Sequence, residues 1–140
     1  MFFSSEIELK ATLENLPKFI EFVINSSISH HLNSKQLFNI ELAIEEALVN
    51  LIKHAYKDKE GYAKIAVAFN EEKQDFIIEI SDQGKQFNIL SKDSPDISSD
   101  IIDRPIGGLG IFFIKKFVSS VLYRFEDNKN ILTLIIHKEI

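Results

Sequence analysis

The chain has 140 residues, of which 45% are apolar and 26% charged, with a formal net charge of −5 at pH 7. This length and composition predict one globular domain over residues 1–140, large enough for a single core. The negative charge argues against nucleic acid as the main partner, because binding to its backbone needs clustered Lys and Arg. The absence of cysteine excludes a disulfide framework, a thiolate metal site and a cysteine nucleophile. With no export-like opening segment and no run of about 20 apolar residues, the sequence predicts a cytoplasmic protein without a membrane span.

Two helices are expected in the first half of the chain. Residues 5–11 alternate loosely and are typical of a short edge strand. Asn15 followed by Pro17 signals a helix start, and apolar residues at helical spacing continue to about residue 30. Ser34 is expected to cap a longer helix over residues 35–56, whose apolar residues recur at three- and four-residue steps. Each helix therefore has one face that should pack against a core.

The second half is richer in strands. The expected elements are strands over 62–70 and 75–82, a polar loop over 83–106, a helix over 109–118 and strands near 119–126 and 130–138. A loop of this length is usually functional or mobile. This order of elements predicts an α+β domain, a two-layer α/β sandwich in which a mixed, mostly antiparallel sheet has its helices on one face.

Polar side chains gather on one face of the longer helix, in the segment IEEALVNLIKHAYK over residues 44–57. At 100° per residue, Glu46 and Asn50 lie one turn apart on the same face, with Lys53 close to them and Glu45 about 100° away. An amide oxygen can bind a hard cation such as Mg²⁺, and a carboxylate can deprotonate a nucleophile. A solvated helix surface would show the same pattern, so this segment alone does not decide between the two.

The strand over 75–82 ends in Asp82, and Gly84 follows two residues later. An ionised Asp at this position can accept a hydrogen bond from an exocyclic amine such as that of adenine. Gly84 leaves space for a ligand ring to lie against the chain. The competing interpretation is an ordinary turn, because Asp-x-Gly is a common turn composition.

Three glycines stand in four positions directly before the last predicted helix, in RPIGGLGIFFIKKF over residues 104–117. Gly108, Leu109 and Gly110 would expose free backbone N–H groups at the positive end of the helix dipole, which is a ready anion site. Arg104 is near enough in sequence to add positive charge. The pattern matches neither a P-loop nor a dinucleotide fingerprint, and a flexible hinge is the competing interpretation.

The three motifs occur together in the order found in one known ATP-binding domain. Glu-x-x-x-Asn on a helix, a strand ending in Asp-x-Gly and a glycine-rich helix entry resemble the domain shared by gyrase, histidine kinases and MutL, the GHKL or histidine kinase-like ATPase superfamily. Within it, EALVNLIKHAY, DQGKQFN and GGLGIFFIKKF are most similar to the bacterial anti-sigma-factor serine kinases of the RsbW and SpoIIAB type. The resemblance covers nearly the whole chain and implies a Bergerat-type ATP-binding fold.

The resemblance also implies roles for individual residues. Glu46 would be the catalytic base, Asn50 the ligand to Mg²⁺ and Asp82 the carboxylate that reads adenine. The other residues that it implies in nucleotide binding are Lys53, Gly84, Arg104, Gly108, Leu109 and Gly110, with residues 88–106 as a lid. Two positions depart from the pattern. Gln86 replaces a glycine of the wider superfamily, which we interpret as a subgroup feature, and Asn88 stands where close relatives often have Asp, for which we have no chemical account.

These roles imply a Mg-ATP-dependent serine/threonine protein kinase that acts as an anti-sigma factor. Such a protein phosphorylates an anti-anti-sigma partner of the STAS type, sequesters a sigma factor and forms a homodimer. The sequence shows no helical hairpin with a phosphoacceptor histidine, which argues against a complete histidine kinase. The competing interpretation is an ATP-binding module that sequesters a partner without phosphotransfer. The presence of both Glu46 and Asn50 favours the kinase, because a pure binding protein needs no base.

Overall fold

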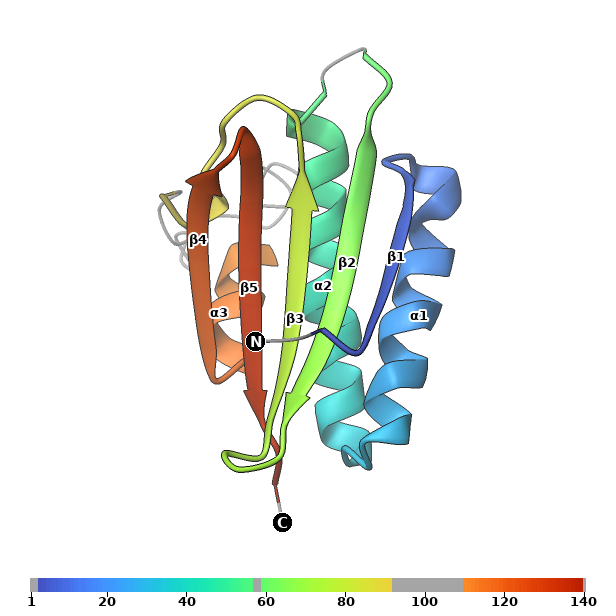
Figure 1. Cartoon of the computed structure of the whole chain (residues 1–140), viewed down its shortest axis with the longest axis vertical. Coiled ribbons are helices and arrows are strands. Elements are labelled where there is room, and N and C mark those ends of the chain that lie inside the picture. Colours follow the sequence, from blue (N-terminus) through green and yellow to red (C-terminus); the bar gives the residue numbers. More distant parts are fainter. Residues whose placement is uncertain (1–2, 57–58, 92–109, 140) are drawn as a thin grey trace, which may run out of the picture.

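One sheet of five strands is covered on one face by three helices (Figure 1). The computed structural model describes residues 3–56, 59–91 and 110–139. The strands are β1 (Ser5–Lys10), β2 (Tyr62–Asn70), β3 (Asp75–Asp82), β4 (Ser120–Glu126) and β5 (Lys129–His137), in the sheet order β1-β2-β3-β5-β4. The helices are α1 (Leu16–Ser29), α2 (Ser34–His54) and α3 (Gly110–Phe117). The predicted α+β class and two-layer arrangement are confirmed.

All strand pairs of the described sheet are antiparallel, so the expectation of a mixed sheet is wrong. The reason lies in the connections. Each of the pairs β2–β3 and β4–β5 is a hairpin, and β3 then pairs with β5 rather than with β4. An antiparallel sheet can leave one face uncovered, which agrees with the single layer of helices in Figure 1.

The core lies between the sheet and the helices. Alternate residues of the strands point toward the helices, as the period of two requires, and the apolar stripe of α2 packs against them. The largest fully buried side chains are Phe19, Phe76, Ile40, Ile44, Leu48, Ile65, Ile78, Ile114, Leu134, Val23 and Val67. Since α2 contributes three of these, its position over the sheet is strongly fixed, and the polar face of the same helix is fixed with it.

Helix α2 is capped by Asn33, and the prediction of Ser34 as its cap is wrong. The Asn33 side chain accepts a hydrogen bond from the Gln36 backbone N–H at 2.8 Å, and the Gln36 side chain accepts one from the Asn33 backbone N–H at 3.3 Å. This is a reciprocal capping box, which a cap at Ser34 could not form because Leu37 would then be its third helical residue. The helix ends at His54 rather than at residue 56.

The chain after β3 returns toward α2 and brings the two elements together. The backbone N–H of Lys85 donates to the carbonyl of Ala55, the residue that follows α2, at 2.8 Å. A short 3-10 helix, η2 (Ile89–Ser91), lies within the predicted loop over 83–106, of which residues 92–106 lie outside the described residues. Among the described helices, none is long and apolar enough to cross a membrane.

Candidate functional site

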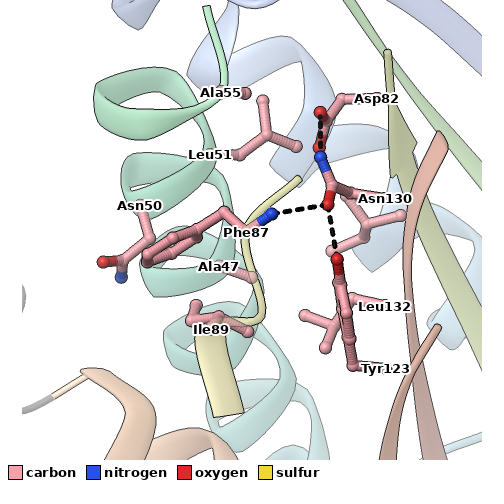
Figure 2. A pocket seen from close by; sticks show the side chains of 11 residues that line it. Ala47, Asn50, Leu51, Ala55, Asp82, Phe87, Ile89, Tyr123, Asn130 and Leu132 are labelled. Carbon is pink, nitrogen blue, oxygen red and sulfur yellow. Dashed lines mark hydrogen bonds between the residues drawn. The ribbon is translucent and has the colours of Figure 1, made fainter. Parts of the chain in front are cut away.

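A pocket opens between the C-terminal half of α2, the end of β3 and the β4–β5 hairpin (Figure 2). Four polar side chains line it: Asn50, Asp82, Tyr123 and Asn130. The other lining residues are apolar: Ala47, Leu51, Ala55, Ile80, Phe87, Ile89 and Leu132. Figure 2 shows Asp82, Asn130 and Tyr123 along the sheet side, with Asn50 at the opposite side of the view. Apolar walls with a few placed polar groups are typical of a small-molecule site.

Asp82 is the last residue of β3 and is almost completely buried, at 8% exposure. Its Oδ1 accepts hydrogen bonds from the Gly84 backbone N–H at 2.9 Å and from the Asn130 side-chain amide at 3.0 Å. Its Oδ2 makes no hydrogen bond to a described residue, since both bonds go to Oδ1. Burial raises the pKa of this carboxyl, and the two hydrogen bonds oppose that shift. Asp82 therefore has one hydrogen-bonded oxygen and one oxygen that can accept a hydrogen bond from a ligand.

Asn130 belongs to the same site, although we did not predict it from the sequence. It lies on β5 directly opposite Asp82 in the strand register and is 6% exposed. Its amide NH₂ donates to Asp82 Oδ1 and to the Lys85 carbonyl at 2.9 Å, and its Oδ1 accepts from the Phe87 backbone N–H at 2.9 Å and from the Tyr123 hydroxyl at 2.6 Å. The strand KNILTLIIH holds other polar residues as well, so no sequence signal singled out Asn130.

Gly84 has a structural reason to be glycine that does not involve a ligand. A Cβ at this position would lie 2.2 Å from the backbone oxygen of Ala55, closer than real Cβ contacts. The absence of a side chain thus lets the segment after β3 pack against the end of α2. This contact closes one end of the pocket and accounts for the glycine, while a contact of Gly84 with a nucleotide stays a prediction.

Glu46 and Asn50 lie one turn apart on α2, as the spacing predicts. The Asn50 side chain is 2% exposed and donates to the Glu46 backbone carbonyl at 2.8 Å, so it does not belong to a solvated helix surface. Glu46 is half-buried, and its Oε2 is enclosed without a hydrogen-bond partner in the part of the chain that the structure describes. Burial raises the pKa of the Glu46 carboxyl, the neighbouring charge of Glu45 raises it further, and the charge of Lys53 lowers it.

The remaining predicted site residues are only partly visible. Lys53 is exposed and near enough to Glu46 for its charge to act there. Gly110 is the first residue of α3. Arg104, Gly108 and Leu109 lie outside the described residues, as does most of the predicted lid. The structure therefore brings Asn50 and Asp82 into one pocket, with Glu46 next to Asn50.

No group of three or more His, Asp or Glu side chains that could hold a metal ion occurs in the part of the chain that the structure describes. The donor set still fits Mg²⁺ bound together with a nucleotide. Mg²⁺ takes oxygen ligands and usually keeps several waters, with one or two protein ligands and the phosphates of the substrate. Asn50 has an amide oxygen, which is a donor of this kind, and Glu46 one turn away has an oxygen without a hydrogen-bond partner among the described residues.

A family model for the histidine kinase-like ATPase domain matches residues 9–136. The chain belongs to this family. The predicted resemblance to RsbW-type kinases is also confirmed, because the chain is 31% identical over 98 residues to serine-protein kinase RsbW of Bacillus cereus. That match covers 67% of this chain and 60% of the relative's own length. Serine/threonine-protein kinase BtrW of Bordetella bronchiseptica is 23% identical over 131 residues, which cover 94% of this chain and 92% of the relative.

Two solved structures support the fold. The RsbU and RsbW domains of a Mycobacterium tuberculosis protein match 96% of this chain and 33% of that chain, with a TM-score of 0.66 and 14% sequence identity. A histidine kinase domain from a blue-light-activated kinase of Erythrobacter litoralis matches 88% of this chain and 61% of that one, with a TM-score of 0.53 and 12% identity. These similarities bear on the fold alone.

Proposed function

We propose that this protein is an ATP-dependent serine/threonine protein kinase of the anti-sigma type. The observation that carries the proposal is Glu46, whose Oε2 is enclosed without a described partner one turn from the buried Asn50. Burial raises the pKa of the Glu46 carboxyl, which brings it nearer to the pH at which a general base works best. A module that only bound a nucleotide would have no use for such a carboxylate.

The nucleotide would enter with its base toward Asp82 and its phosphates toward Asn50. The apolar walls of the pocket suit a purine ring, and the Oδ2 of Asp82 can accept a hydrogen bond from the exocyclic amine of adenine. Lys53 and, by resemblance, Gly84, Arg104, Gly108, Leu109 and Gly110 would add contacts to the nucleotide. Mg²⁺ held by the Asn50 oxygen would neutralise charge on the phosphates.

The transfer itself requires little of the protein beyond position and charge. The hydroxyl oxygen of a partner's serine or threonine would bond to the γ-phosphorus of ATP, and the bond between that phosphorus and the β–γ bridging oxygen would break. ADP leaves, and the proton of the hydroxyl passes to the Glu46 carboxylate. The lack of a partner on Glu46 Oε2 supports this role, because no described donor occupies that oxygen.

The proposed partners rest on the resemblance of the motifs to anti-sigma-factor kinases, and the proposed activity is supported by the names of the relatives. Both curated relatives are named as serine or serine/threonine protein kinases. We propose that the acceptor is an anti-anti-sigma protein of the STAS type, that the unphosphorylated partner releases a sigma factor which this protein otherwise sequesters, and that the protein acts as a homodimer. Its use of ATP would place it in the cytoplasm.

The proposal is tested by phosphate incorporation into candidate partners encoded nearby, with labelled ATP and Mg²⁺ in single-turnover assays. Glu46→Gln keeps the size of the side chain but removes the base, so transfer should fall by about 10²–10⁴ while ATP still binds. Glu45→Gln is the matched control, because Glu45 is exposed and about 100° away around the helix. A wild-type protein that binds ATP and a partner but transfers no phosphate would instead be a sequestering module.

A further inference from the structure

An open groove of about 510 Å³ lies between α1 and α2, and none of its lining residues belongs to the nucleotide pocket. Its lining includes four apolar side chains of α1, namely Leu16, Pro17, Ile20 and Ile24. None of these four is fully buried, although the core-facing stripe of the same helix is. Helix α1 therefore has a second apolar stripe, beside the one that faces the core.

Exposed apolar side chains extend this surface. Ile28 lies one turn after Ile24 on α1 and is 53% exposed, and Phe38 of α2 is 61% exposed. Phe38 lies three residues before Glu41, which lines the groove, so the two share one side of α2. From Pro17 to Ile28 the helix rises about 17 Å, the length of about three turns. An exposed apolar strip with a polar rim is typical of a surface that contacts another protein.

The rim of the groove is acidic. Glu21 of α1 and Glu41 of α2 line it, and both side chains are exposed. Neither carboxylate forms an ion pair with another residue in the part of the chain that the structure describes. Helix α1 has one basic residue, Lys18, and α2 has no lysine, arginine or histidine between Lys35 and Lys53. The groove therefore combines an apolar floor with negative charge that no described ion pair neutralises.

We propose that this groove binds an amphipathic helix of a protein partner, whose apolar stripe lies on α1 and whose lysine or arginine side chains meet Glu21 and Glu41. An amphipathic helix in an apolar groove is a common mode of recognition, with anchors three and four residues apart. A symmetric contact with a second copy of this chain does not fit, because it would bring the same carboxylates against each other. An anionic membrane or a nucleic acid would be repelled for the same reason.

The groove and the nucleotide pocket lie on opposite sides of α2. Glu41 lines the groove and Asn50 lines the pocket, and nine residues at 100° each place them about 180° apart around the helix. A partner can therefore be held in the groove while ATP occupies the pocket. This inference rests on the proposed sequestration of a partner and not on the transfer of phosphate, since the partner concerned is held rather than phosphorylated.

The test measures, by fluorescence anisotropy, the binding of a labelled helical peptide of about 14 residues, about four turns, to the full chain. The lysine probe has leucines three and four residues apart with lysines beside them, and the glutamate probe has the same leucines with glutamates in place of the lysines. The wild type should bind the lysine probe about tenfold more tightly than the glutamate probe. The double variant Glu21→Gln/Glu41→Gln should bind the lysine probe about 3- to 10-fold more weakly than the wild type, because two ion pairs are lost.

Glu8→Gln/Asp127→Asn is the matched control, because it removes two exposed negative charges outside the groove, one on β1 and one in the β4–β5 turn. Its affinity for the lysine probe should stay within about twofold of the wild type, since exposed charges outside the groove are screened by salt. Equal losses in the two double variants would mean that net charge alone attracts the probe, which would overturn the proposal.

A second pair of variants tests the apolar contact. Phe38→Ala should bind the lysine probe about fivefold more weakly, whereas Leu122→Ala, which truncates a similarly exposed side chain on β4, should leave binding unchanged. A wild type that binds neither probe, or binds both equally, refutes this inference alone. A wild type that binds the lysine probe as expected but transfers no phosphate to any partner refutes the proposed transfer and supports the groove.

Discussion

Burial raises the pKa of both Asp82 and Glu46, but the two carboxylates differ in their hydrogen bonds. At the Asp82 end, five hydrogen bonds converge on the Asn130 side chain, and the described donors near the carboxylate are occupied. At the Glu46 end, an enclosed carboxylate oxygen has no hydrogen-bond partner among the described residues. The described donors around Asp82 are all hydrogen-bonded, which keeps the shape of the pocket. The Glu46 oxygen, which would take up a proton in the proposed reaction, has no described partner.

This difference also separates the effects of mutation. A substitution at the Asp82 end should disturb both the fold and the choice of ligand, because several elements meet there. A substitution at the Glu46 end should disturb catalysis or metal binding while the fold persists. An unsatisfied buried group costs stability, so removing its charge can even stabilise the protein.

The largest effect on stability is expected for Gly84→Ala, at the Asp82 end. A methyl group would lie 2.2 Å from the Ala55 backbone oxygen, and neither backbone segment can move without breaking the Lys85–Ala55 hydrogen bond. We expect a loss of about 3 kcal/mol in the free energy of unfolding, measured by urea denaturation. Gly61→Ala should cost less, because its added methyl meets the Tyr56 ring, which can shift at the cost of two solvent-accessible hydrogen bonds of its hydroxyl rather than by moving a backbone segment. Equal losses of stability in the two variants would mean that the backbone at Ala55 can shift to make room for the methyl group.

Asp82→Asn should have opposite effects on binding and on stability. The new amide can keep its oxygen on Gly84 and Asn130 while it turns NH₂ toward the ligand's own amine, so ATP affinity should fall by about 1.5–3 kcal/mol. Without ATP, the variant should be more stable than the wild type at neutral pH, because burial of the ionised carboxylate is unfavourable. Calorimetry and urea unfolding measure the two effects separately.

The pH dependence of that stability difference follows from the sign of the shift. The folded-state pKa of Asp82 is raised above its ordinary value of 3.8, so the native state binds more protons than the unfolded state between the two values. The free energy of unfolding of the wild type therefore falls as the pH rises through this window. Asp82→Asn lacks this fall, and its advantage should grow from pH 4 to pH 8. A constant difference across that range would contradict a raised pKa.

Asn50→Ala probes the other end and should separate metal binding from folding. Its amide bonds to a helix carbonyl of Glu46, which also accepts a backbone N–H, so apo stability should change by about 1 kcal/mol or less. The tightening of ATP binding by Mg²⁺ should disappear, because one oxygen ligand is lost. Calorimetric titrations with and without Mg²⁺ measure this. A variant that keeps the full Mg²⁺ effect would exclude Asn50 as a ligand.

The sequence was informative where the signal is local. Helical spacing and strand alternation predicted every described α-helix and strand to within a few residues, but neither 3-10 helix, and the spacing of Glu46 and Asn50 predicted their shared face. The cap of α2 was misplaced because Asn33 and Ser34 both suit a cap, and the choice depends on Gln36, whose side chain reaches back to Asn33. A capping-box search would have found it.

Non-local features could not be predicted in the same way. The wholly antiparallel sheet depends on β3 pairing with β5, which no local pattern encodes. Asn130 is 48 positions from Asp82 in sequence, and only the strand register puts them opposite each other. Gly84 was read as space for a ligand, but its packing against Ala55 became visible only once α2 and the segment after β3 were placed together.

The smallest effect on ATP binding is expected for Tyr56→Phe, which tests how firmly the segment after Asp82 must be held. The Tyr56 hydroxyl donates to the Tyr62 carbonyl at 2.6 Å and accepts from the Gln83 N–H at 2.9 Å. Both partners are solvent-accessible, so their loss should cost about 1 kcal/mol in the free energy of unfolding. Burial raises the pKa of Tyr56 above its ordinary value of 10.0, so the native state holds this proton more tightly and the wild type loses stability as the pH rises above about 10.

Tyr56→Phe lacks that titration, and the advantage of the wild type over the variant should therefore shrink at alkaline pH. Tyr62→Phe is the matched control, because the Tyr62 side chain is 53% exposed and the backbone carbonyl that Tyr56 uses is retained. Urea unfolding at pH 8 and pH 11 measures both variants. If the segment after β3 is held mainly by Asn130 and Ala55, ATP affinity should stay within about threefold of wild type in Tyr56→Phe. A larger loss would show that the bond from the Gln83 N–H to the Tyr56 hydroxyl is needed to hold the segment after Asp82 in place for ATP binding. The bonds of that segment to Asn130 on β5 would then not be sufficient.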